Sequence, residues 1–118
     1  APMDPDFNRG IWSRLESRSR MWTNDYEGVY VISGPLFLPE KQGSKNEVHY
    51  RLIGKNQVAV PTHFFKIIIG KKGAQYVKEA YVLPNTAISK DVSLREFLSS
   101  IEEIEKSSGI EFPRYQRF

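Results

Sequence analysis

Cysteine is absent from this chain of 118 residues. Disulfide bonds and thiolate metal sites are therefore excluded, and the redox compartment cannot be inferred from cysteine usage. Long apolar runs are also absent: the longest, HFFKIII, is far shorter than the ~20 residues that a membrane-spanning helix requires. The first residues do not form the basic-then-apolar pattern of a signal peptide, so we expect any targeting peptide to have been removed.

A strong charge of either sign is lacking as well. Seventeen Lys and Arg residues against fourteen Asp and Glu residues give a net charge of +3. That balance permits nucleic acid binding without arguing for it. Hydrophobic residues make up 40% and charged residues 26% of the chain, which is typical of a folded globular protein. The length fits a single domain, or part of one.

The stretch FNRGIWSRLESRSR, Phe7 to Arg20, has helical spacing. An apolar stripe at the period of an α-helix runs along it and continues beyond it, formed by Ile11, Leu15 and Trp22. Asp6 is placed to cap its N-terminus. The sequence therefore predicts a helix from Asn8 to Asn24.

Polar residues follow a second line along this predicted helix. Residues four apart on an α-helix are offset by only about 40° and rise about 6 Å. Asn8, Trp12, Glu16 and Arg20 therefore form one ridge, and this ridge borders the apolar stripe. We expect semi-buried positions, where packing holds the polar side chains while they still reach a cleft.

The residue types on this ridge suit metal and phosphate. An Asn oxygen and a Glu carboxylate are hard ligands that suit Mg²⁺, an ion that keeps most of its waters. The Arg20 guanidinium could donate two parallel hydrogen bonds to phosphate oxygens. Spacing alone leaves another interpretation open. In it Asn8 is a helix cap, and Glu16 with Arg20 is a surface ion pair worth about 0.3–0.5 kcal/mol.

The middle of the chain has the pattern of an antiparallel sheet. GVYVISG, Gly28 to Gly34, predicts a buried strand, and EVHYRLI predicts a half-buried one after a polar loop, KQGSKN. QVAVP and HFFKIII predict two more strands, and the hairpin signal GKKG leads into another, QYVKEAYVL.

A second helix is predicted late in the chain, from Ile101 to Ser108. Ser100 followed by Glu103 forms a capping box at its start. Gly109 stands where a helix C-terminal glycine belongs.

Basic residues gather in one part of the chain. Between Pro61 and Lys78 there is no acid, and there are four lysines: Lys66, Lys71, Lys72 and Lys78. The first three are candidates for a rim that binds the nucleic acid backbone. The sequence favours a solvated hairpin over that rim, because exposed turns favour lysine in any case.

Several long strings, taken in order, resemble a known family. FNRGIWSRLESRSR, VYVISGPLFLP, YRLIGKNQVAVPTHFFKIII, AYVLPN and IEEIEKSSGI resemble the DNA/RNA non-specific endonucleases, most closely the endonuclease G branch. The resemblance covers nearly the whole chain. It implies an α+β fold of the ββα-metal nuclease type, with a metal-site helix followed by a mainly antiparallel sheet and a late helix.

The resemblance also implies roles for three residues. In that family an asparagine in the context N-x-x-x-W-x-x-L-E is the direct protein ligand of the catalytic Mg²⁺. A glutamate eight residues on holds metal-bound waters, and an arginine four beyond it contacts phosphate. These positions match Asn8 as metal ligand, and Glu16 and Arg20 as catalytic residues. Mg²⁺ is thus the expected cofactor, with Mn²⁺ as a substitute.

One family motif has no match here. The family's general base is a histidine in an Asp-Arg-Gly-His string upstream of the metal helix, whereas His49 and His63 lie in strand patterns and are interpreted as structural or surface residues. The family's Asn-x-x-Pro-Gln string is also cut, with Met3 at the glutamine position. We therefore expect residues 1–118 to be one domain, or the C-terminal half of a nuclease domain whose N-terminal half supplies the histidine.

The function implied by the resemblance is a Mg²⁺-dependent endonuclease. It would hydrolyse DNA and RNA without sequence specificity and leave 5′-phosphate ends. Its expected partners are DNA, RNA, the N-terminal half and a second copy in a homodimer, in mitochondria or outside the cell. Two alternatives stay open: a non-catalytic nucleic-acid-binding or interaction domain derived from such a nuclease, and a purely structural domain.

Overall fold

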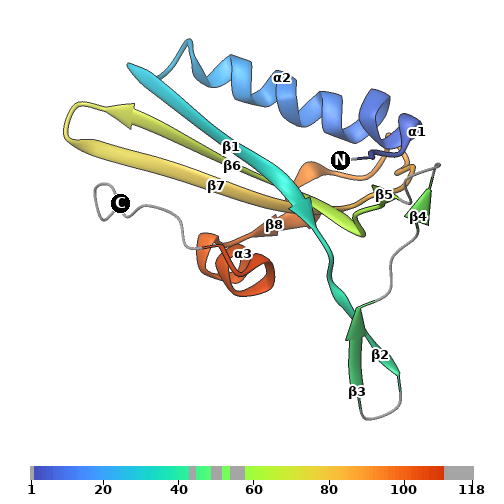
Figure 1. The fold of residues 1–118 in the computed structure, drawn as a ribbon. Coiled ribbons are helices and arrows are strands. Elements are labelled where there is room, and N and C mark those ends of the chain that lie inside the picture. The colour runs from blue at the N-terminus through green and yellow to red at the C-terminus, as the bar shows by residue number, and fades with distance from the viewer. Residues whose placement is uncertain (1, 43–44, 49–51, 54–57, 111–118) are drawn as a thin grey trace.

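Four antiparallel strands and two layers of helix form the body of the protein in the computed structural model (Figure 1). The structure describes residues 2–42, 45–48, 52–53 and 58–110. The elements, in chain order, are α1 (Pro5–Phe7), η1 (Asn8–Trp12), α2 (Ser13–Trp22), β1 (Gly28–Leu36), β2 (Pro39–Gln42), β3 (Lys45–Val48), β4 (Leu52–Ile53), β5 (Val58–Ala59), β6 (His63–Lys72), β7 (Gln75–Pro84), η2 (Leu94–Phe97), β8 (Leu98–Ser99) and α3 (Ile101–Ser108).

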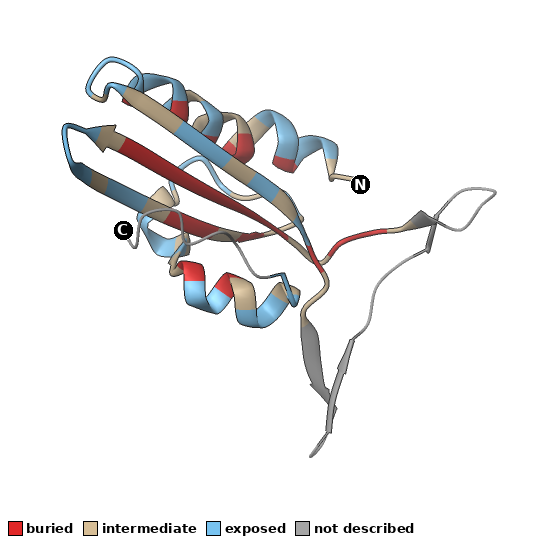
Figure 2. Cartoon of the chain, turned by 60° about the vertical axis from the view of Figure 1, so that its left-hand side comes forward, coloured by how far each residue is buried: buried red, intermediate tan, exposed pale blue. Residues whose placement is uncertain are grey.

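The main sheet has the strand order β1-β6-β7-β8, and every neighbouring pair is antiparallel. Helix α2 lies along one face of this sheet and α3 lies against the other (Figure 1). Strand β6 is central and covered on both faces, so it is buried along almost its whole length (Figure 2). This is why HFFKIII is a continuous apolar run rather than an alternating one.

Two apolar clusters fill the spaces on either side of the sheet. Alternate side chains of β6 point to opposite faces. Phe64 and Ile68 join the cluster under α2, together with Phe7, Trp12 and Leu15. The other face packs against α3, with Phe65, Ile67, Ile69, Ile101 and Ile104. The first helical segment is thereby fixed to the sheet by its apolar stripe.

The first helix begins earlier than the sequence predicted. Asp4, not Asp6, is its N-cap, since the Asp4 carboxylate accepts hydrogen bonds from the backbone N–H groups of Asp6 (2.9 Å) and Phe7 (3.0 Å). Pro5 then occupies the first helical position, where the missing N–H costs nothing. The helical segment is also not one regular α-helix, because η1 is a wide π-helical turn.

Strand β1 is longer and more exposed than predicted. It runs from Gly28 to Leu36 and pairs on one side with β6. Its other side has no partner among the described strands, so Tyr30 and Val31 are 52% and 45% exposed. The prediction of a buried strand was therefore wrong, because β-branched and aromatic residues also suit a half-covered edge.

Between β1 and β6 the chain forms short strand pairs. The predicted loop KQGSKN instead contributes to β2 and β3, which pair antiparallel and project away from the main sheet (Figure 1). Part of the predicted strand EVHYRLI lies in β3 and β4, while residues 49–51 lie outside the described part of the chain. None of the helices among the described residues is long and apolar enough to cross a membrane.

The predicted hairpin and late helix are confirmed. Gly73 has φ 63° in the turn that joins β6 to β7, a left-handed conformation that glycine adopts at little cost. Helix α3 runs from Ile101 to Ser108, with the Ser100 hydroxyl accepting a hydrogen bond from the Glu103 N–H (3.1 Å). Gly109 ends it with φ 75°.

Candidate functional site

The polar ridge of the first helix is arranged differently from the prediction. Asn8, Glu16 and Arg20 are all exposed, whereas Trp12 is only 6% exposed and belongs to the core. The expectation of one semi-buried ridge is therefore wrong. The cause is the π-helical turn over Asn8–Trp12, which departs from helical dihedral angles at Gly10 (φ −93°, ψ −109°). Such a turn holds more residues than an α-helical turn, so Trp12 is rotated toward the sheet.

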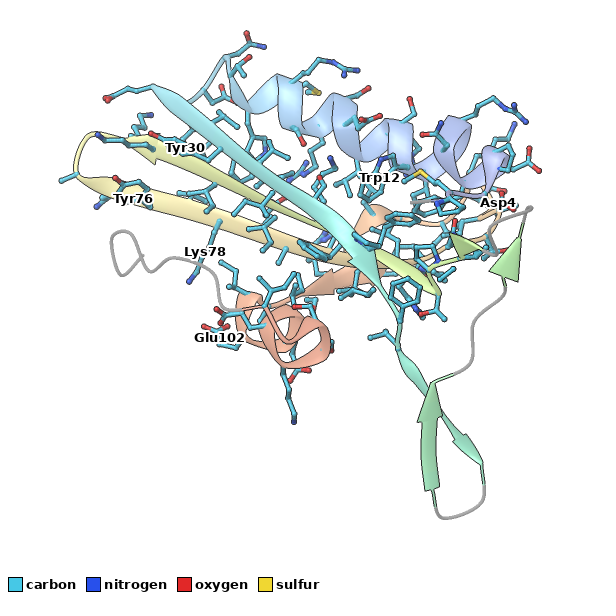
Figure 3. All side chains as sticks on the ribbon, viewed as in Figure 1. Asp4, Trp12, Tyr30, Tyr76, Lys78 and Glu102 are labelled. Carbon is cyan, nitrogen blue, oxygen red and sulfur yellow. The ribbon has the colours of Figure 1, made fainter. Side chains whose placement is uncertain are left out.

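Trp12 anchors the backbone between Asn8 and Glu16. Its ring centroid lies 5.5 Å from that of Phe7 and 5.8 Å from that of Phe64, distances typical of favourable aromatic pairs. Figure 3 shows Trp12 beneath the helix, on the side that faces the sheet. The backbone that bears Asn8 and Glu16 is thus packed against the sheet through Trp12, while the side chains of these two residues are exposed.

Among the described residues, the side-chain oxygens of Asn8 and Glu16 have no hydrogen-bond or ion-pair partner, although the Glu16 carboxylate interacts electrostatically with Lys66 at longer range. Asp4 caps the N-terminus of this helix, so the Asn8 side chain does not serve as the cap. Arg20 donates to the Ser17 hydroxyl (3.1 Å) rather than pairing with Glu16. The interpretation of Asn8 as a cap and of Glu16 with Arg20 as a surface ion pair is therefore not what the structure has.

The donor set fits a metal ion that keeps most of its waters. Among the residues that the structure describes, no three His, Asp or Glu side chains group closely enough to hold a metal between them. A site enclosed by protein ligands is therefore absent there. One amide oxygen and one carboxylate, both hard and exposed, suit a largely hydrated Mg²⁺ that also binds a substrate phosphate.

Lys66 lies under this part of the helix, a position that sequence reasoning missed. It is only 5% exposed, donates to the Ser33 hydroxyl (2.9 Å), and its Nζ lies 4.5 Å from the centroid of the Trp12 ring. Burial lowers the pKa of Lys66, and the carboxylate of Glu16 opposes that shift. Both sequence interpretations, a backbone-binding rim and a solvated hairpin, were wrong for Lys66. The sequence signal was the apolar run around it, HFFKIII, which does not by itself show that a helix covers the strand.

The other predicted residues take different positions. Lys71 is half-buried and Lys72 is exposed, both at the hairpin end of β6. His63 is half-buried at the start of β6, with its Nδ1 2.9 Å from the Thr62 hydroxyl, and burial lowers its pKa. His49 lies outside the described residues.

Replacing Lys66 by methionine is expected to leave the free energy of unfolding unchanged or to raise it at about pH 7. A buried cation has a desolvation cost, and apolar replacements of similar volume are often neutral or stabilising. Because the folded-state pKa of Lys66 is lowered, the wild-type protein gains stability as the pH rises toward the ordinary pKa of lysine. The difference between the variant and the wild type should therefore shrink at about pH 10.

Urea denaturation at the two pH values measures this, with Lys72→Met as the exposed control. That control should change little at either pH. A Lys66→Met variant that loses more than about 2 kcal/mol at pH 7 would show that the contacts with Trp12 and Ser33 outweigh the desolvation cost.

Known proteins resemble this chain throughout its length. The DNA/RNA non-specific endonuclease family matches residues 1–117. Human mitochondrial endonuclease G is 46% identical over 114 residues, which cover 95% of this chain and 38% of the human protein. Human mitochondrial nuclease EXOG is 40% identical over 116 residues, covering 94% of this chain and 32% of that protein. The chain thus spans less than two fifths of either relative.

A solved structure shows the same fold. A chain of the EndoG/EndoGI complex superposes with a TM-score of 0.91 at 42% identity, covering 98% of this chain and 50% of that chain. The predicted α+β fold of the ββα-metal nuclease type is thereby confirmed. With the family matched from residue 1 to residue 117, this chain belongs to the DNA/RNA non-specific endonucleases.

Proposed function

We propose that this chain provides the metal-binding and phosphate-binding helix of a Mg²⁺-dependent endonuclease that cleaves DNA and RNA without sequence specificity. One observation carries the proposal. Asn8 and Glu16 present exposed oxygens, which accept no hydrogen bond from the described residues, on either side of the buried Trp12 and in the family's asparagine–glutamate spacing. The nuclease names of the similar proteins support the same activity.

Each residue of the helix has a proposed part. Asn8 would hold Mg²⁺ through its amide oxygen, and Glu16 would accept hydrogen bonds from the waters of the metal and so fix their orientation. Arg20 would donate to phosphate oxygens and offset their charge. When bound, Mg²⁺ supplies Lewis-acid stabilisation of the negative charge that develops on the phosphate and the leaving oxygen.

The general base is proposed to come from another segment. His63 is half-buried beside Thr62 at the start of β6, and its ring lies 2.9 Å from the Thr62 hydroxyl rather than in a hydrogen bond to a described residue of the ridge. The deprotonation of an attacking water needs a group of suitable pKa within hydrogen-bond reach. We therefore assign that step to a histidine in an N-terminal half, as the family motif implies. Hydrolysis would then leave 5′-phosphate ends.

Sequence-independent cleavage follows from the kind of contact available. Arg20 and the metal would meet the sugar–phosphate backbone, which carries no sequence information directly. The mitochondrial names of several relatives support a mitochondrial location for the whole protein. A homodimer is proposed on the family resemblance alone.

Removal of divalent metal tests the proposed function. The protein, with any polypeptide that co-purifies with it, is expected to cleave plasmid DNA and RNA in Mg²⁺. EDTA should abolish this cleavage, and added Mg²⁺ or Mn²⁺ should restore it. Product ends are checked by ligation, which requires 5′-phosphates. Cleavage that persists in EDTA would contradict the metal role, and salt-dependent binding without cleavage would favour the non-catalytic alternative.

A further inference from the structure

A cavity lies on the flank of α2 that faces away from Glu16. It has a volume of about 570 Å³, and α2, β7, η2 and β8 supply its walls. Arg14 and Arg18 line it from the helix. Each is two residues from Glu16, and two residues turn an α-helix by about 200°. The cavity and the proposed metal site are therefore on opposite sides of one helix.

The charged groups of the cavity leave a surplus of positive charge. Arg14, Arg18 and Arg95 line it together with one acid, Glu79. Both Glu79 oxygens accept from Arg18 (2.8 and 2.7 Å), and one also accepts from the Tyr81 hydroxyl (2.6 Å). The adjacent guanidinium holds the pKa of Glu79 below its usual range. Both carboxylate oxygens of Glu79 are therefore already engaged in hydrogen bonds with Arg18 or Tyr81.

Two guanidinium groups remain without an acidic partner. Within the described ranges, neither Arg14 nor Arg95 lies in an ion pair with a carboxylate. Arg14 donates to the carbonyl of Val92 (3.0 Å), which fixes its position on the cavity wall. A concave surface with unneutralised cations concentrates positive potential, and anions are attracted to it.

The remaining lining suits a phosphate attached to a larger group. Guanidinium groups bind phosphate oxygens through paired N–H donors. The Ser93 hydroxyl also lines the cavity and adds a polar group. The Tyr81 hydroxyl donates its proton to Glu79 (2.6 Å), and burial together with Glu79 raises the pKa of Tyr81 to about 12, so that it stays protonated. Leu98, which is 50% exposed, adds an apolar surface beside these polar groups. Sugar or base atoms could rest on that surface.

We propose that this cavity binds a phosphate group of a nucleic acid strand, on the side of α2 opposite the metal site. The claim that the phosphate belongs to a nucleic acid rests on the proposed function. The claim that the cavity binds an anion does not. A free phosphate has the same chemistry, so the test separates the two sources. Arg95 is the residue to change, because it is exposed and lies outside the proposed metal site.

The experiment measures binding without Mg²⁺, so that hydrolysis plays no part. Inorganic phosphate is titrated while the Nε–Hε NMR signals of the arginines are observed. The Arg14 and Arg95 signals should shift in the wild type. Arg95→Gln should weaken phosphate binding by about tenfold, as loss of a charge-assisted hydrogen bond does. Lys106→Gln, on the opposite face of the sheet, is the control for an equal loss of charge and should change the affinity less than about twofold.

A single-stranded oligonucleotide forms the second arm. The logarithm of the binding constant is plotted against the logarithm of the salt concentration. Arg95→Gln should reduce the slope of this plot by the amount expected for about one lost phosphate contact, and Lys106→Gln should leave it unchanged. Phosphate shifts without that change in slope would assign the cavity to free phosphate and overturn the strand proposal. No phosphate shift at Arg14 and Arg95, or equal effects of the two variants, would overturn the site itself. Binding here by a protein that never hydrolyses DNA would remove the proposed function and leave this site standing.

Discussion

Substitution of Asn8 by alanine is expected to lower the rate of Mg²⁺-dependent DNA cleavage by roughly 100-fold or more. Asn8 offers an exposed amide oxygen with no protein partner in the described chain, and it is the proposed protein ligand of the metal. The fold should be unaffected, because Asn8 is exposed and is not one of the buried residues of the core cluster under α2. The initial rate of plasmid nicking at saturating Mg²⁺ measures the effect.

A matched change elsewhere on the same segment serves as the control. Asn24 is exposed just beyond α2, so Asn24→Ala removes the same amide outside the proposed site. It should cleave DNA at close to the wild-type rate. Circular dichroism and thermal denaturation establish that both variants are folded. If Asn8→Ala is folded and keeps a near-normal rate, the assignment of Asn8 as metal ligand is wrong.

Substitution of Phe7 by alanine is expected to lower the free energy of unfolding by about 3–5 kcal/mol. Phe7 is 0% exposed, and its ring centroid lies 5.9 Å from that of Phe64 and 5.5 Å from that of Trp12. The substitution would leave a cavity where the first helical turn meets the sheet. Because Asn8 is the next residue, cleavage should fall as well.

Urea denaturation of the purified variants measures this loss. Phe7→Leu keeps most of the apolar volume and should cost clearly less than the alanine substitution. Tyr30→Ala removes an aromatic ring at a position that is 52% exposed, so it should change the stability by less than about 1 kcal/mol. A Phe7→Ala variant as stable as the wild type would show that α1 and η1 are not held by this packing.

Local signals in the sequence predicted the elements whose structure is set locally. The late helix was predicted with its correct ends, because the Ser100 cap and the Gly109 stop act within a few residues. The hairpin after β6 was predicted for the same reason, since Gly73 supplies the positive φ that the turn needs. The apolar stripe of the first helix also identified the side that packs on the sheet.

Features that depend on distant parts of the chain were not predictable in this way. Ideal helical spacing placed Trp12 on the polar ridge, yet the π-helical turn and the aromatic cluster draw it into the core. The position of β1 at the sheet edge depends on strand order, which its own residues do not encode. The burial of Lys66 depends on a helix that packs over its strand from more than forty residues away.

The candidate site likewise combines features that the sequence predicted with features that it did not. Spacing alone brought Asn8, Glu16 and Arg20 onto one predicted helix, but it could not choose between a metal site and an ordinary solvated face. The family resemblance favours the metal site, and the structure adds that, among the described residues, the Asn8 and Glu16 oxygens are exposed and accept no hydrogen bond. The arginines of the α2 cavity gave no sequence signal, because their common wall forms only when α2 packs beside β7 and η2.

Titration with Mn²⁺ while the backbone amide NMR signals are observed tests the central claim most directly. Bound Mn²⁺ broadens the signals of nearby nuclei, so the first signals to disappear locate the metal. The account predicts early loss of the signals around Asn8, Trp12 and Glu16, and no such loss around Asn8 in the Asn8→Ala variant. Early loss confined to the acidic helix α3, around Glu102 and Glu103, would contradict it.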